Sequence, residues 1–67
     1  MLRNYIVYGV DAEGYRHEVK TTPVAREARL SRDAEIGRWE RVVVVGPDGE
    51  LSEAELSFLS DKGHRYA

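Results

Sequence analysis

The residues that most resemble a chemical motif surround a turn at positions 46–49. Asp48, Gly49 and Glu55 have the spacing of the fifth, sixth and twelfth positions of a calcium-binding EF-hand loop. The first and third positions of such a loop need carboxylates for a hard cation, and here they hold Val44 and Gly46. We therefore expect a turn followed by a capped helix, and no calcium site.

The histidines and serines give no stronger sign of a reactive site. A zinc site needs three or four convergent ligands, and this chain has no cysteine and two histidines, His17 and His64. Asp61 is the local partner of His64, at a spacing that the end of a helix also explains. We predict no metal, no cofactor and no catalysis. The serines lack the G-x-S-x-G context of an activated nucleophile; they are Ser31, Ser52, Ser57 and Ser60.

Three arginines recur at every third position along one predicted helix: Arg26, Arg29 and Arg32. Such a row could contact phosphates, so weak nucleic-acid binding is the alternative function that we consider. Acidic residues are interspersed with the arginines, Asp33 lies four residues after Arg29, and the chain has a net charge of −2. These features favour solvated ion pairs along the helix over a nucleic-acid surface.

Three tyrosines on the predicted strands, Tyr5, Tyr8 and Tyr15, offer a second candidate surface. Aromatic rings can stack on unpaired bases. On strands, however, tyrosines more often pack against cross-strand neighbours, and in protein interfaces they act as anchors. We therefore interpret them first as packing or protein-binding residues.

The composition of the chain indicates a small soluble domain. Its 67 residues are 42% hydrophobic and 33% charged. We expect one domain over residues 1–63 and a flexible tail over residues 64–67. No stretch approaches the roughly 20 apolar residues of a membrane span, and the short N-terminal apolar run does not fit a signal peptide. The lack of cysteine favours the cytoplasm, the initial methionine suggests a complete small protein, and the preference for arginine over lysine suggests a bacterial origin.

A β-hairpin is predicted over residues 3–21, with its turn at residues 11–14. A four-residue loop would pair Val10 with Tyr15, and a bulged three-residue loop would pair Asp11 with Tyr15. A slip of one residue exchanges the two faces of a strand, so these registers bury different side chains. The first groups Ile6, Tyr8, Val10, Tyr15 and Val19 on one face, and the second groups Tyr5, Val7, Tyr15 and Val19.

The rest of the chain predicts a helix over residues 23–36, a strand over residues 40–45 and a second short helix. In the first helix, Trp39 and Ile36 extend an apolar stripe that begins at Val24. A competing interpretation continues the sheet through residues 24–30 and starts a shorter helix at residue 31. The second helix begins at the capping box formed by Ser52 and Glu55.

These elements predict an α+β fold with the order ββαβα. The simplest sheet is three-stranded and mixed, with strand order 2-1-3 and both helices mainly on one face. The run Val42–Val45 then forms an edge strand with one face uncovered, which is a liability unless something pairs with it or covers it.

We therefore predict a small non-catalytic protein-interaction module that associates with itself through the Val42–Val45 strand. A nucleic-acid binder is the alternative, and an accessory subunit of a larger complex is a third possibility. The protein partner is a second copy of the chain or another protein, with neither a membrane nor a small-molecule substrate involved. The predicted contact residues are Tyr5, Val7, Tyr8, Val42 and Val44.

Overall fold

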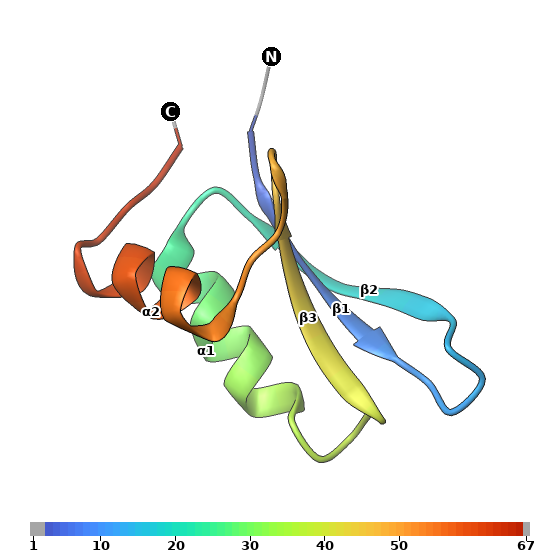
Figure 1. Cartoon of the computed structure of the whole chain (residues 1–67). Coiled ribbons are helices and arrows are strands. Elements are labelled where there is room, and N and C mark those ends of the chain that lie inside the picture. The colour runs from blue at the N-terminus through green and yellow to red at the C-terminus, as the bar shows by residue number, and fades with distance from the viewer. Residues whose placement is uncertain (1–2, 67) are drawn as a thin grey trace.

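A four-stranded antiparallel sheet with two helices forms the protein in a computed structural model that describes residues 3–66 (Figure 1). The α+β class is confirmed, and the strand order is β2-β1-β3-β4. The elements are β1 (Tyr5–Val10), β2 (Arg16–Thr22), α1 (Ala25–Glu35), β3 (Arg41–Gly46), β4 (Gly49–Glu50) and α2 (Glu53–Asp61).

The fourth strand corrects the three-stranded mixed sheet expected from the sequence. β3 and β2 run in the same direction, but β1 lies between them, so every neighbouring pair is antiparallel. β4 forms because the chain reverses at once after β3. Gly49, at φ 124°, takes a left-handed conformation that suits glycine, and it pairs with Gly46 while Glu50 pairs with Val45.

The β1–β2 hairpin has the bulged three-residue loop. The Asp11 amide donates a hydrogen bond of 3.0 Å to the Tyr15 carbonyl, and Gly14 has a φ of 90°. A further irregularity follows, because Val7 lies opposite Lys20 whereas Tyr8 lies opposite Glu18. This bulge leaves Val19 without a direct partner in the register. Tyr5 and Val7 face the core together, as the bulged-loop register predicts.

Helix α1 is shorter than expected and lies close to the sheet. The predicted helix is confirmed at Ala25–Glu35, and the competing interpretation, in which the sheet continues through residues 24–30, is wrong. Ala25 and Ala28 are fully buried against the strands, and their small side chains let the helix backbone approach the sheet.

The residues at the two ends of α1 differ from the expectation. Trp39 lies beyond the helix and not on its apolar stripe. Thr22 does not cap the helix directly: its hydroxyl accepts a hydrogen bond from the Val24 amide at 3.1 Å.

Helix α2 begins at the predicted capping box. The Ser52 hydroxyl accepts from the Glu55 amide at 3.1 Å, and the Glu55 carboxylate accepts from the Ser52 amide at 2.9 Å. Both helices lie on the same side of the sheet, and α2 contacts mainly α1 (Figure 1). Neither helix of the described chain combines the length and apolar character that crossing a membrane requires.

The hydrophobic core lies between the helices and one face of the sheet, which we call the helix face. The accessible surface of the whole chain is 4523 Å², close to the ~4300 Å² typical of a folded monomer of this mass. The chain therefore covers its core without a partner. The buried core residues are Tyr5, Val7, Ala25, Ala28, Val44 and Leu56.

Residues 64–66 lie in the segment predicted as a flexible tail (residues 64–67) and form hydrogen bonds with residues before and within the first turn of α1. The Ala25 amide donates to the His64 carbonyl at 2.9 Å, and the Tyr66 amide donates to the Pro23 carbonyl at 2.8 Å. The side chains of Tyr5 and His64 share a hydrogen bond of 2.5 Å. This segment therefore closes one end of the core, and Ala67 lies outside the described residues.

Candidate functional site

Three of the five residues predicted to contact a partner lie in the core. Tyr5 and Val7 are fully buried, and Val44 is 3% exposed. Val42 is half-buried on the same helix face. Only Tyr8 lies on the opposite face of the sheet. The cause is the alternation of side chains along β1 and β3, which sends every second residue toward the helices.

The face of the sheet turned away from the helices, which we call the outer face, carries an apolar strip. Tyr8 pairs with Val43 and Ile6 pairs with Val45, and antiparallel partners point to the same side. Val10 continues the strip at the end of β1, but Val10 and Val43 are buried, so Ile6, Tyr8 and Val45 provide its accessible area. No helix or strand of residues 3–66 covers this face (Figure 1). The valine strand is thus apolar on both faces, and one of them meets no other element in this part of the chain.

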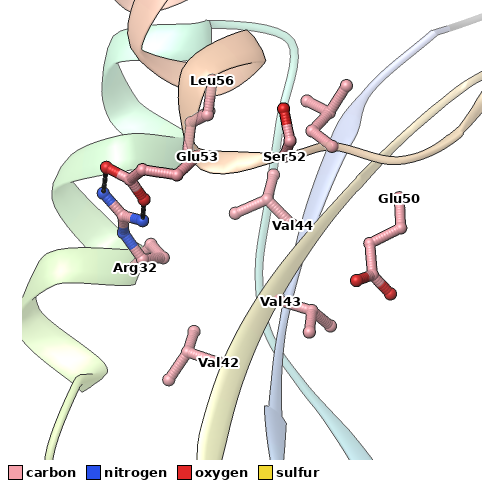
Figure 2. Close-up of a pocket in the computed structure, with 9 residues that line it drawn as sticks. Arg32, Val42, Val43, Val44, Glu50, Ser52, Glu53 and Leu56 are labelled. Carbon is pink, nitrogen blue, oxygen red and sulfur yellow. Dashed lines mark hydrogen bonds and ion pairs between the residues drawn. The ribbon is translucent and has the colours of Figure 1, made fainter.

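Polar residues border this strip on both sides. Arg16 and Glu18 on β2 lie opposite Val10 and Tyr8, and Glu50 on β4 lies opposite Val45, so all three point to the outer face. Arg41, opposite Val10 on β3, is a further charged residue on this face. Figure 2 shows Val42 and Val44 on the helix side of β3, and Val43 and Glu50 on the other side. An apolar centre with a polar rim is the usual composition of a protein interface.

An ion pair crosses the outer face from one border to the other. A guanidinium nitrogen of Arg16 lies 3.2 Å from a carboxylate oxygen of Glu50, and the guanidinium carbon lies 5.6 Å from the centre of the Tyr8 ring. This arrangement covers part of Tyr8 and joins β2 to β4. The side chains of Arg16 and Glu50 remain 45% and 49% exposed, so solvent screens their attraction.

The two edges of the sheet are protected in different ways. β2 carries exposed Arg16, Glu18 and Lys20 and a bulge, which are features that discourage strand pairing. On the other side, β4 pairs with the end of β3, and the Leu51 amide donates to the Val44 carbonyl at 2.9 Å. Within the described chain, only positions 41–43 of β3 remain free for an added strand.

A small groove lies beside β3, below the start of α2 (Figure 2). Its volume is about 110 Å³, whereas pockets for cofactors and drug-sized ligands usually hold about 300–1,000 Å³. Its size therefore gives no support to a small-molecule site. The lining residues are Arg32, Val42, Val43, Val44, Glu50, Leu51, Ser52, Glu53 and Leu56.

The arginine row of α1 contacts the second helix. Arg32 binds both carboxylate oxygens of Glu53, with Nη2 at 3.2 Å from Oε1, and Arg29 lies 3.2 Å from Asp61. The hydrogen bonds from Arg32 hold the pKa of Glu53 below its usual value. The pair expected between Arg29 and Asp33 is replaced by these contacts between helices. Arg26 is exposed, so two of the three arginines proposed for nucleic acid are engaged elsewhere.

The two histidines lie in different environments. His17 is hydrogen-bonded to Asp11 at 2.8 Å and stacks on Trp39, with ring centres 5.2 Å apart. The hydrogen bond from His17 lowers the pKa of Asp11. His64 contacts Tyr5, and burial, followed by the influence of Tyr66, raises the pKa of Tyr5 to about 12. Among residues 3–66, no three metal-ligating side chains gather in one place.

The turn that resembles an EF-hand is built as a structural element. It joins β3 to β4, and the Glu55 carboxylate accepts a hydrogen bond from the Ser52 amide. The role of Glu55 in the capping box explains its position in the sequence. Nothing in this geometry directs its carboxylate toward a cation.

Reasoning from the sequence missed Arg16 and Glu50 as neighbours on the outer face. The alternation of charged residues in β2 placed Arg16 on one face, but the short strand that carries Glu50 had no separate signal. Two residues are too few for a periodic pattern.

The most exposed large apolar side chains of the described residues do not lie on the outer face. They are Tyr15, Leu30, Ile36 and Phe58.

Comparison with protein-family models, with curated proteins and with solved structures gives no match to this chain. Inference about its function therefore depends on the surfaces described above.

Proposed function

We propose that this protein is a small interaction module that associates with itself through the outer face of its sheet. The observation that supports this proposal best is the apolar strip of the outer face, which has polar borders and no helix or strand of residues 3–66 above it. Burial of apolar area on both partners is the main favourable term in such association. Val45, which is half-buried, brings the valine strand into this surface, and Tyr8 is its aromatic anchor.

Pairing at the free edge of β3 has less support than packing at the outer face. With β4 and Leu51 beside the second half of β3, an added strand would find only three residues, which offer few backbone hydrogen bonds. The outer face offers side chains from four strands.

The expected affinity is low. Three strands about 20 Å long and the two-residue β4, about 7 Å long, lie about 4.8 Å apart and give a face of roughly 320 Å². This is less than half of the ~800 Å² per partner in a standard interface. The chain also covers its core as a monomer. We therefore expect a reversible dimer that forms at high concentration and not an obligate one.

Sedimentation equilibrium over about 10 µM to 1 mM tests the proposal, because this range covers weak dissociation constants. The wild-type protein should show a concentration-dependent dimer. Val45→Lys places a charge on the outer face and should raise the dimer dissociation constant at least tenfold, with the fold retained because Val45 is half-buried.

Leu30→Lys is the matched control, since Leu30 is 62% exposed on α1, on the other side of the molecule. It should leave the dimer unchanged. A strictly monomeric wild-type protein at about 1 mM would refute the proposal. Loss of the dimer in the Leu30 variant alone would move the interface to the helices and refute the outer face.

A further inference from the structure

We infer that the turn between β3 and β4 is a site of spontaneous modification, at which Asp48 rearranges to isoaspartate and releases β4 from the sheet. The reaction needs neither an enzyme nor a cofactor, because the nucleophile is the backbone amide of the next residue. It takes place within one copy of the chain, so it does not depend on the proposed dimer. Two features distinguish Asp48 from the other aspartates: the residue that follows it and the surroundings of its carboxylate.

The residue after Asp48 leaves the attacking nitrogen unhindered. Asp48 is the only aspartate of the chain that a glycine follows, since alanine or lysine follows the other three. A side chain on the following residue obstructs the approach of its nitrogen to the aspartate carboxyl carbon, and glycine has no side chain. Apart from the two neighbours of Gly49 in the chain, no atom of residues 3–66 lies within 4 Å of the place where its Cβ would be. The Gly49 nitrogen is therefore the least obstructed nucleophile beside an aspartate in this protein.

The carboxylates of the other three aspartates are held in place by hydrogen bonds. The donors to Asp11, Asp33 and Asp61 are the Tyr15 amide at 2.9 Å, Arg32 at 2.8 Å and Arg29 at 3.2 Å. Asp48 is exposed, and within residues 3–66 its carboxylate has neither a hydrogen bond nor an ion pair. Its side chain is thus free to turn toward the Gly49 nitrogen.

The reaction passes through a succinimide ring. The Gly49 nitrogen attacks the protonated side-chain carboxyl of Asp48, a C–N bond forms, and the carboxyl hydroxyl leaves with the amide proton as water. A water molecule then opens the ring at either carbonyl. Opening at the side-chain carbonyl restores aspartate. Opening at the main-chain carbonyl gives isoaspartate, in which the backbone runs through the former side chain and the α-carboxylate is free.

The short strand β4 allows the nitrogen to become available. Gly49 is paired with Gly46 in the register, so attack requires this pair to separate. β4 has two residues, and neither Gly49 nor Glu50 is buried. Local opening of such a segment costs far less than opening of the core, because no buried apolar contact is lost. The folded protein therefore reaches the reactive arrangement without global unfolding.

Isoaspartate prevents the sheet from closing again at this position. It lengthens the backbone of the turn by the former Cβ atom, whereas the ladder between β3 and β4 requires a turn of two residues. Loss of β4 frees the Leu51 amide, which lies 2.9 Å from the Val44 carbonyl, and separates Glu50 from Arg16. The modification thus changes an edge of the sheet and leaves the core intact.

Peptide mapping by mass spectrometry tests the site, with samples of the purified protein taken during incubation at neutral pH. The peptide that contains Asp48 should first lose the mass of one water and then give a second chromatographic peak of unchanged mass, which is isoaspartate. Asp48→Glu is the matched control. It keeps the charge and the following glycine but requires a larger ring, so it should give no isomer.

The other aspartates and the unfolded chain provide the contrary outcomes. Isoaspartate should not be detected at positions 11, 33 and 61 of the folded protein while it accumulates at position 48. Equal isomerisation at all four positions would refute the inference. Isomerisation of Asp48 in concentrated urea but not in the folded protein would show that the turn prevents the reaction, and would refute the inference as well.

Amide hydrogen exchange tests the release of β4. The isoaspartate form, separated by ion-exchange chromatography under native conditions, should have lost the protection of the Leu51 amide. The Glu40 amide, which donates to the Val10 carbonyl at 2.9 Å on the other side of β3, is the internal control and should stay protected. Equal protection of Leu51 in the modified and unmodified proteins would overturn the structural consequence.

Discussion

The indole ring of Trp39 lies against the backbone of Gly9, at a place where a Cβ atom on residue 9 would come within 2.2 Å of the ring. Gly9 is on the helix face of β1, opposite His17, which stacks on the same indole. The Trp39 Nε1 atom donates to Glu35 at 2.9 Å, which fixes the ring at the end of α1. A glycine in the middle of a strand is thus required by the close approach of a tryptophan.

Gly9→Ala should destabilise the protein by about 1–3 kcal/mol, because the added methyl group overpacks the site and displaces the indole. Urea denaturation monitored by tryptophan fluorescence measures the loss. In a Trp39→Ala background the same change should cost less, since the clash has been removed. Equal costs in the two backgrounds would contradict the predicted contact.

Ser52→Ala should reduce the free energy of unfolding by about 1 kcal/mol, because it removes the side-chain acceptor for the Glu55 amide at the start of α2. Ser57→Ala, within the same helix and outside the cap, is the matched control and should change stability by less than about 0.5 kcal/mol. Thermal unfolding by circular dichroism compares the two. Similar effects of both changes would argue against a capping role.

The buried hydroxyl of Tyr5 should make the protein sensitive to alkaline pH. Its pKa is about 12 in the folded state and 10.0 at an unperturbed position, so the folded state favours the neutral phenol. That contribution is complete below pH 10 and is lost as pH rises through 12. The loss is on the order of 2 kcal/mol, and urea midpoints measured from pH 8 to pH 12 would detect it.

Tyr5→Phe provides the control for this titration. The variant cannot ionise at position 5, so it should lose less stability than the wild type between pH 10 and pH 12, although it starts lower because it lacks the bond to His64. An identical alkaline loss in both proteins would assign the effect to other tyrosines.

The arginine row allows a direct test of the nucleic-acid alternative. Arg29→Ala and Arg32→Ala should each lower the thermal midpoint, because they remove ion pairs between the two helices, whereas Arg26→Ala should not. Binding to single-stranded oligonucleotides should be weak in the wild type and unchanged in all three variants. Salt-sensitive binding that is lost in the Arg29 and Arg32 variants would instead support the nucleic-acid alternative.

Local signals in the sequence were sufficient for much of the fold. The capping box at Ser52 and the left-handed glycine of the hairpin turn are determined by residues within a few positions of each other, so the sequence reveals them. The strand order 2-1-3 also followed, since a crossover helix after a hairpin allows few arrangements.

The faces of the sheet could not be predicted in the same way. The first strand is apolar on both sides, so its pattern did not decide whether Tyr5 or Tyr8 meets the helices. The bulge beside Val7 and the two-residue strand at Glu50 depend on contacts with distant residues. The same is true of the contact between His64 and Tyr5, which lie 59 residues apart in the sequence.

The short strand β4 has a consequence for solubility. Four adjacent valines with a fully open edge could recruit one chain after another and grow into a fibril. Gly49 and Glu50 occupy the end of that edge, and the charged β2 strand protects the opposite one. Growth by strand addition is thereby restricted at both edges of the sheet, whereas the outer-face contact proposed above would close with two molecules. An apolar surface on the outer face is therefore compatible with protection of the valine strand from fibril growth.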